Sequence, residues 1–171
     1  IDEDGSPRGN RDIVLWEPPL DEETLEEYDD GSGDLMEGFE QARRSSAREA
    51  ASVTAHLAIN DMQTLQFTTA RQGTEIGAKQ AVGAASDHPR ERYIDVEPYH
   101  AGLGKRKRRA VENQLKSTDL EGVLSTNAQE LGIDIGSVDA TVTDSYPGTK
   151  QSFWQQIGRA GRGTSDALSV L

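Results

Sequence analysis

The residues with the clearest capacity for chemistry are one glutamine and two arginines near the end of the sequence, Gln155, Arg159 and Arg162. Successive residues of a helix are about 100° apart, so positions i, i+4 and i+7 share one face. The spacing therefore predicts a helix that carries all three side chains along one edge. An apolar face opposite them would anchor this helix, formed by Phe153, Ile157 and Ala160. Because a guanidinium is always charged and offers forked donors, the predicted edge suits phosphate.

The residues around this helix predict how it begins and ends. Pro147-Gly148 indicates a turn, and Thr149 can cap the first turn of the helix. Glycines at positions 158, 161 and 163 would let backbone or phosphate approach closely at the other end.

The charge of the chain is unevenly distributed. A net charge of −12 argues against a nucleic-acid partner, but residues 1–40 hold 15 Asp and Glu against two Arg, whereas residues 41–171 have a net charge of +1. Residues 105–109 are five consecutive bases, a place where a phosphate backbone could be held. Arg outnumbers Lys 13 to 5, and with the acid excess this suggests a halophile; a single acidic insertion would give the same totals.

The composition excludes several classes of protein. No apolar run approaches the roughly 20 residues that span a bilayer, and no signal sequence opens the chain, so we expect no membrane partner. The absence of cysteine excludes disulfides and thiolate metal sites and fits a cytoplasmic location. No metal site is predicted. Since the chain begins with Ile1 and ends within an apolar run, we expect a piece of a longer protein, truncated at its C-terminus.

The order of elements predicts an α/β fold. We expect a linker or the exit from a preceding domain at residues 1–12, and one domain over 13–171 with an acidic, partly disordered loop at 20–40. Apolar runs predict strands at 13–16, 65–67, 93–96, 122–126, 138–142 and after 167. Helical patterns lie between them, at 41–60, 73–84, 105–115 and 128–131, with the terminal helix last.

Two packing faces follow from these patterns. The helix at 73–84 is predicted to turn Ile76, with the small residues Gly77, Ala81 and Ala84, toward the core, and the helix at 105–115 to be anchored by Val111 and Leu115. Alternating strands and helices indicate a parallel sheet with helices on both faces. Because ligands bind beyond the carboxyl ends of such strands, Thr68, Ser125-Thr126 and the 155–162 helix are predicted to meet there.

Four stretches in order resemble the motifs of the second RecA-like motor domain of superfamily 2 helicases. The Gln-x-x-Gly-Arg-x-Gly-Arg sequence at 155–162 resembles motif VI, residues 125–136 motif V, residues 67–71 motif IV, and residues 99–103 the histidine-glycine motif. The sequence of residues 126–136 and 146–156 is similar to that of DEAD/DEAH-box DNA helicases of the mitomycin-repair type. The resemblance implies a RecA-like, P-loop NTPase-type sheet over residues 13–171.

The resemblance assigns roles at a nucleotide. Arg162 would be the arginine finger that stabilises the charge of the transition state, with Arg159 beside it on the γ-phosphate and Gln155 positioning the nucleotide. Asp134 would contact ribose or orient a finger arginine. The neighbouring glycines Gly132 and Gly158 would belong to the same ATP site.

A second set of residues would contact a nucleic-acid strand. Ser125 and Thr126 have hydroxyls and backbone N–H groups that can bind phosphates without reading bases. His100 would contact or shape the phosphate path, or serve as a buried, hydrogen-bonded histidine. For Thr68 and Arg71, phosphate contact and support of a helix start remain open alternatives.

The sequence has no phosphate loop of the Gly-x-x-x-x-Gly-Lys-Ser/Thr type. We therefore expect ATP and Mg²⁺ to be bound mainly by a preceding RecA-like domain of the same polypeptide, with single-stranded or tailed duplex DNA as the other partner. The isolated fragment is expected to lack ATPase activity. Two alternatives are a non-catalytic RecA-like module that binds nucleic acid or protein, and a DEAD-box-type RNA helicase domain.

Overall fold

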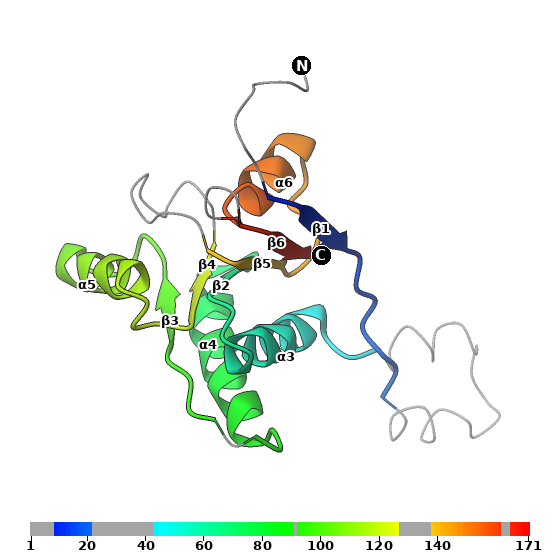
Figure 1. Ribbon diagram of the computed structural model, residues 1–171, viewed down its shortest axis with the longest axis horizontal. Helices are drawn as coiled ribbons and strands as arrows, with labels where there is room; N and C mark the ends of the chain where they lie inside the picture. The colour runs from blue at the N-terminus through cyan, green and yellow to red at the C-terminus, as the bar shows by residue number, and fades with distance from the viewer. Residues whose placement is uncertain (1–8, 22–42, 91, 127–137, 162–164) are drawn as a thin grey trace.

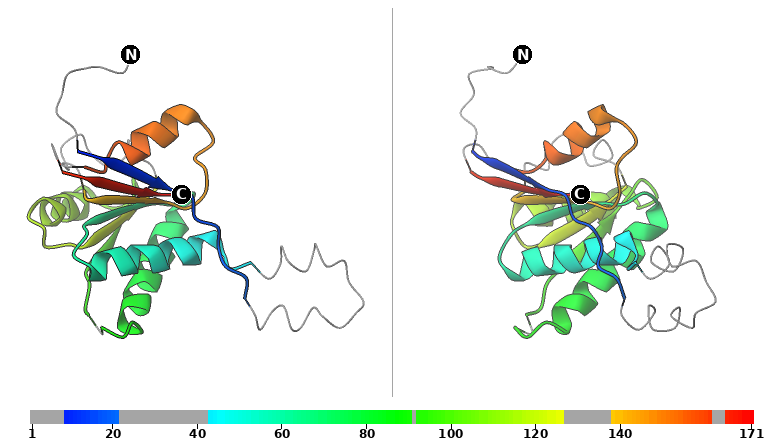
Figure 2. Two further views of the ribbon diagram at one scale, coloured as in Figure 1. Left: turned by 45° about the vertical axis from the view of Figure 1, so that its right-hand side comes forward. Right: turned by 90° about the vertical axis from the view of Figure 1, so that its right-hand side faces the viewer.

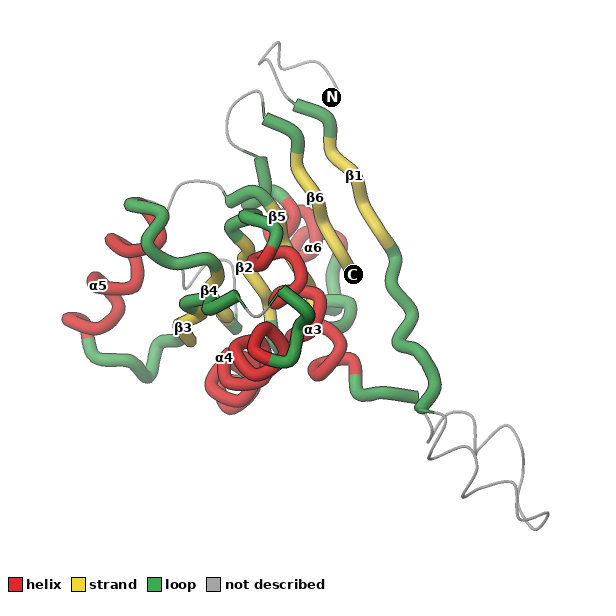
Figure 3. Tube along the Cα trace, turned by 60° about the horizontal axis from the view of Figure 1, so that its bottom comes forward, coloured by secondary structure: helices red, strands yellow, loops and turns green. Residues whose placement is uncertain are grey.

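The computed structural model describes residues 9–21, 43–90, 92–126, 138–161 and 165–171. Within these ranges, six strands form one parallel sheet in the order β1-β6-β5-β2-β4-β3. The strands are β1 Arg11–Val14, β2 Thr64–Phe67, β3 Val96–Tyr99, β4 Gly122–Ser125, β5 Ala140–Thr143 and β6 Ala167–Val170. The first and last strands, β1 and β6, lie side by side at one edge (Figures 1 and 3).

Helices cover both faces of this sheet, which confirms the predicted fold class. Helices α3, Ser46–Ile59, and α4, Arg71–Ser86, pack on one face, and α5, Lys105–Lys116, and α6, Lys150–Ile157, on the other. Figure 2 shows α3 and α4 on one side of the strands and α6 on the opposite side. The alternation of side chains along β2 explains the division: Gln66 accepts a hydrogen bond from α3, while Phe67 packs in the cluster of α5.

The layer of α3 and α4 is close-packed because its contact residues are small. The cluster between these helices and the sheet contains Ala51, Ala55, Ala78, Ala81 and Ala85. Gly77 of α4 lies so near β4 that a Cβ at this position would be 2.5 Å from Cδ2 of Leu124. The predicted inward position of Gly77 is therefore correct and has a steric reason.

Two local predictions on this side are wrong. Ile76 is 46% exposed, because α4 turns Thr74, Gly77 and Ala81 toward the core instead. The strand predicted at 93–96 begins only at Val96: Tyr93 is 76% exposed, and Ile94 is buried without belonging to a strand. An apolar run indicates burial, but the register of pairing with β4 decides which residues form the strand.

The first strand begins two residues before its apolar run, which starts at Ile13. It covers Arg11–Val14, and the chain continues alongside β6, where Trp16 donates its backbone N–H to the carbonyl of Leu171 at 2.7 Å. The predicted acidic loop at 20–40 follows this strand in the sequence. Residues 22–42 lie outside the described residues, and an antiparallel bridge joins Leu20 to Arg43 on either side of them.

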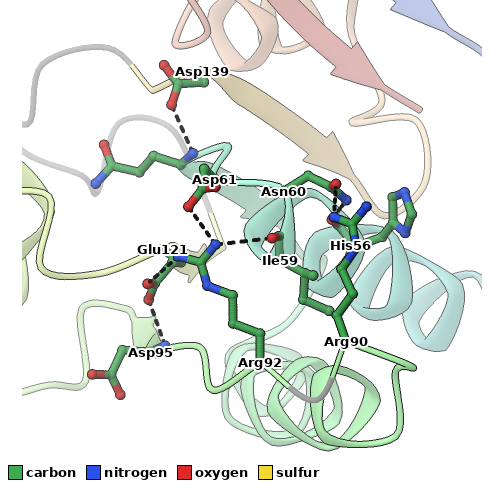
Figure 4. A network of polar contacts seen from close by, with 10 residues as sticks. His56, Ile59, Asn60, Asp61, Arg90, Arg92, Asp95, Glu121 and Asp139 are labelled. Carbon is green, nitrogen blue, oxygen red and sulfur yellow. Dashed lines mark hydrogen bonds and ion pairs between the residues drawn. The ribbon is translucent and has the colours of Figure 1, made fainter.

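Polar contacts close the amino ends of the central strands (Figure 4). Arg92 donates to the carbonyl of Ile59 at 3.1 Å and forms ion pairs with Asp61 and Glu121. Glu121 in turn accepts the backbone N–H of Asp95 at 2.8 Å. These bonds connect the loops before β3 and β4 to the end of α3.

Candidate nucleotide and nucleic-acid site

Helix α6 begins as predicted and ends earlier than predicted. Thr149 caps it, since its Oγ1 accepts the backbone N–H of Ser152 at 3.1 Å. The last helical residue is Ile157, with Gly158 as the C-terminal cap. Arg159 therefore follows the helix, and the prediction that one continuous helical edge carries Gln155 and both arginines is wrong.

The cause of this early end is a backbone pairing that helical periodicity does not report. Val138, just before β5, donates its N–H to the carbonyl of Arg159 at 3.0 Å, and Gly161 donates to the carbonyl of Val138 at 2.8 Å. Ala160 thus forms a parallel bridge with Val138. Gly161 has φ of +95°, a conformation that favours glycine over other residues. The turn at 158–161 is therefore fixed to the sheet through the peptide groups on both sides of Ala160, directly after Arg159.

This pairing places Arg159 at the amino end of β5. Thr68 and Thr126 follow the carboxyl ends of β2 and β4, at the opposite end of the sheet. The prediction that the 155–162 segment meets them at one rim is therefore wrong for Arg159. Helix α6 lies near the carboxyl ends through Ser152 and Gln156, and the chain reaches the amino end of β5 only after the helix.

Three of the predicted nucleotide residues, Arg162, Asp134 and Gly132, lie outside the described residues. Of the others, Gln155 and Gly158 are exposed and Arg159 is half-buried. A Cβ on Gly158 would be 2.8 Å from the carbonyl oxygen of Trp154, so a side chain here would disturb the end of α6.

A hollow of about 280 Å³ opens at the carboxyl ends of β2, β4 and β5. Its wall contains the hydroxyl side chains Thr68, Thr69, Thr126 and Ser152. Hydroxyl and backbone donors of this kind can hold phosphates without reading bases. Ser125 has no exposed surface, whereas Thr126 is half-buried, so of these two residues only Thr126 reaches the surface of the hollow.

Two further residues of the hollow escaped the sequence analysis. Gln156 is 7% exposed and its Oε1 accepts from the hydroxyl of Thr143 at 3.3 Å, so it connects α6 to β5. Asp144 is also 7% exposed, and it precedes Ser145, whose φ is +80°. The adjacent Gln155-Gln156 pair was the available signal, but periodicity alone did not show which glutamine faces the sheet.

Thr68 and Arg71 lie where β2 passes into α4. The hydroxyl of Thr68 donates to the carbonyl of Ala70 at 3.0 Å, which supports the start of the helix. Arg71, the first residue of α4, is exposed. Its Nη1 lies 4.0 Å from the position that a Cβ on Gly102 would take, which brings the guanidinium beside the loop after β3.

His100 connects this loop to α4. Its Nδ1 accepts the backbone N–H of Gly102 at 3.1 Å, so in the neutral ring the proton is on Nε2, which lies 3.1 Å from Oε1 of Glu75. The histidine side chain is 12% exposed. A Cβ on Gly102 would be 2.9 Å from Nδ1, so the glycine leaves room for the ring.

The base-rich start of α5 follows the same loop. Lys105, Arg106, Lys107 and Arg109 are exposed, Arg108 is half-buried, and Lys107 pairs with Glu97 at 3.5 Å. Cations at a helix N-terminus oppose the helix dipole, so this cluster is not explained by helix stability. Val111 and Leu115 anchor α5, as predicted.

The domain has a parallel sheet with helices on both faces. The turn that contains Arg159 lies beside β5, and hydroxyl groups lie beyond the carboxyl ends of the strands. These features define a RecA-like domain of the helicase type. The profile of the family "Helicase conserved C-terminal domain" matches residues 50–164, and the chain belongs to this family. The prediction of a superfamily 2 helicase C-terminal domain of the mitomycin-repair type is confirmed by the relatives that follow.

The whole chain is similar to the ATP-dependent helicase HRQ1 of Saccharomyces cerevisiae, at 33% identity over 172 residues. It is 31% identical over 178 residues to the ATP-dependent helicase YprA of Bacillus subtilis. The chain covers 15% of the yeast protein and 21% of the Bacillus protein. It therefore corresponds to a minor part of these relatives.

Solved structures of helicases are also similar to this chain. The DUF1998 helicase MrfA bound to DNA and AMPPNP superposes with a TM-score of 0.77 at 30% identity, over 99% of this chain and 21% of that one. The helicase Lhr of Mycobacterium smegmatis, bound to ssDNA and AMP-PNP, has a TM-score of 0.67 at 22% identity, over 95% of this chain and 19% of that one, and supports the fold. No helix in the described ranges has both the length and the apolar character needed to cross a bilayer.

Proposed function

We propose that this chain is the second motor domain of an ATP-dependent DNA helicase or translocase. It would supply Arg159 and Arg162 to a nucleotide that the preceding RecA-like domain binds together with Mg²⁺. The observation that carries the proposal is the anchored turn after α6, in which two backbone bonds to Val138 hold the peptide groups on both sides of Ala160, directly after Arg159. The two relatives named as ATP-dependent helicases and the MrfA complex with DNA and AMPPNP support it.

The anchored turn suits transition-state stabilisation. Charge on the transferring phosphoryl group is stabilised best by donors that are already in place, and an arginine finger contributes about 10³–10⁵ in rate. A turn paired with the sheet needs little reorganisation when the cleft between the two motor domains closes. Gln155, Gly158, Gly132 and Asp134 would complete the nucleotide contacts.

The carboxyl ends of the strands would hold the DNA strand. Thr126 lines the hollow together with Thr68 and Thr69, and Arg71, two residues further on, lies beside the loop of His100. These groups suit phosphates, which position a strand and carry no sequence information. ATP binding would draw the two motor domains together through Arg159 and Arg162, and hydrolysis would release them, so that the domains step along the strand.

The test is Arg159→Ala and Arg162→Ala, made separately in the full-length parent protein. DNA-stimulated ATP turnover should fall by about 10³ or more in at least the finger variant, because the transition-state charge loses its partner. Affinity for single-stranded DNA should stay within roughly threefold, since the proposed role of both arginines is at the nucleotide and Arg159 lies away from the carboxyl ends. Turnover is measured by phosphate release and affinity by fluorescence anisotropy.

Arg48→Ala is the matched control, because Arg48 is an exposed arginine of α3, far from the α6 turn in the fold. It should leave turnover unchanged. The isolated chain should show no ATPase activity. Wild-type turnover in both arginine variants would reject the motor role and favour a non-catalytic module. If the parent protein unwinds an RNA duplex in preference to a DNA duplex, the substrate is RNA and not DNA.

A further inference from the structure

The end of α6 receives a side chain from the opposite end of the sequence. Arg11 of β1 donates from Nη1 to the carbonyl of Ile157 at 2.7 Å and from Nη2 to the carbonyl of Ala160 at 2.9 Å. These two carbonyls lie on either side of Arg159 in the chain. We propose that Arg11 is a positioning residue that sets the place of the Arg159 turn; this inference rests on the proposed function of that turn.

A guanidinium suits this place for two reasons. The last carbonyls of a helix lack intrahelical partners and carry the negative end of the helix dipole, so a cation there is stabilising. The planar fork of arginine presents two donors in fixed directions, which matches two acceptors at once. A lysine ammonium is a single point of charge and cannot fix the separation of the two carbonyls in the same way.

Arg11 completes a two-sided clamp. Val138 holds the turn from β5 by bonds to Arg159 and Gly161, and Arg11 holds it from the edge strand. The side chain of Arg11 points to the face of α6 because β1 pairs in register with β6, Arg11 opposite Ala167. Removal of Arg11 leaves the turn attached on one side only.

Few other contacts of β1 explain the presence of an arginine here. All four residues of β1 are exposed, with Ile13 at 42% and Val14 at 39%. The strand therefore contributes little to the core, and its side-chain contact with α6 is made by Arg11 among the described residues. Residues that precede β1 would connect to the preceding domain, so this contact would also link that connection to the arginine turn.

The experiment compares Arg11→Ala, Arg11→Lys and the control Arg48→Ala in the full-length parent protein. Displacing a catalytic group by about 1 Å can cost about 10²-fold in rate, and a turn still held by Val138 should lose less, about tenfold in kcat. The KM for ATP should change less than about twofold, because nucleotide is bound mainly by the other domain. Arg11→Lys should recover part of the loss. The melting temperature of each variant reports folding.

A double variant shows whether Arg11 acts through Arg159. If it does, Arg11→Ala combined with Arg159→Ala should turn over ATP no more slowly than Arg159→Ala alone. Additive losses, or wild-type kcat in Arg11→Ala, would overturn the inference. A loss of kcat that follows a loss of folding in both Arg11 variants would overturn it as well.

The two proposals can fail separately. If Arg159→Ala and Arg162→Ala keep full turnover, the motor role fails, and hydrogen exchange then tests the placement of the turn directly. The amides of Val138 and Gly161 should exchange faster in Arg11→Ala than in Arg48→Ala, because their bonds to the turn open more often. Equal exchange in the two variants would overturn the clamp.

Discussion

The two ends of the sheet carry different polar side chains and use them differently. At the amino end, Arg92 is bonded to Ile59, Asp61 and Glu121, and Asp139 accepts the backbone N–H of Gln63 at 2.9 Å (Figure 4). At the carboxyl end, hydroxyl groups surround a hollow of about 280 Å³. The amino-end groups connect loops and strands of the domain to one another, whereas the carboxyl-end groups line a space that a ligand can enter.

The turn that contains Arg159 does not fit a simple division between the two ends of the sheet. It lies beside the amino end of β5, but it belongs to the face of α6 and is held by backbone bonds and by Arg11. Gln156, the last residue but one of α6, is bonded to Thr143 at the hollow, and the turn with Arg159 follows directly after the helix. The comparison predicts that substitutions in the amino-end network change stability and that substitutions at the hollow change binding.

The largest effect is expected at Gln63, in the amino-end network. Its Nε2 donates to the buried carbonyls of Leu115 and Leu120 at 2.8 and 2.9 Å, and the residue is 6% exposed. Gln63→Leu would leave both carbonyls without this donor, and the loss of two such bonds should lower the free energy of unfolding by about 2–4 kcal/mol. Urea unfolding measures it.

Gln114→Leu is the matched control, because the side chain of Gln114 is exposed on α5. It should change the free energy of unfolding by no more than about 0.5 kcal/mol. DNA affinity of the folded protein should be unaffected in both variants. A Gln63→Leu protein of wild-type stability, or one that folds normally and no longer binds DNA, would contradict the division between the two ends.

A smaller effect is expected at the hollow. Thr126→Val keeps the shape of the side chain and removes its hydroxyl, so affinity for single-stranded DNA should fall by about 1 kcal/mol, roughly fivefold. Thermal unfolding should change little. The salt dependence of binding should also keep its slope, because a neutral hydroxyl releases no counterion.

Arg71→Ala provides the contrast at the same end of the sheet. Removing one phosphate-bound cation should reduce the slope of log affinity against log salt by about 0.7 for a single strand. Ser86→Ala, at the far end of α4, should change neither quantity. Equal affinity in wild type and Thr126→Val would remove Thr126 from the strand site.

The sequence predicted the parallel sheet, the two helical faces and the positions of α3, α4 and α5 because these follow from local periodicity and element order. It could not predict where α6 ends, since that is decided by the bridge between Val138 and Ala160, which are distant in sequence. The contact of Arg11 was missed for the same reason. The motif residues were found in order along the chain, but their placement at two ends of one sheet depends on the direction of α6.

The smallest effect is expected at the edge of the amino-end network, at Tyr93. Its hydroxyl donates to Oδ1 of Asp95 at 2.9 Å, and this bond, then the negative charge of Asp95, raises the pKa of Tyr93 above its ordinary value of 10.0. Because the folded pKa is raised, this contribution to stability is present below the ordinary pKa and is lost as pH rises through the raised one. Asp95→Asn should lower the pKa of Tyr93, which ring-carbon NMR would follow above pH 10. An unchanged pKa in that variant would show that the carboxylate at this end does not act on the phenol.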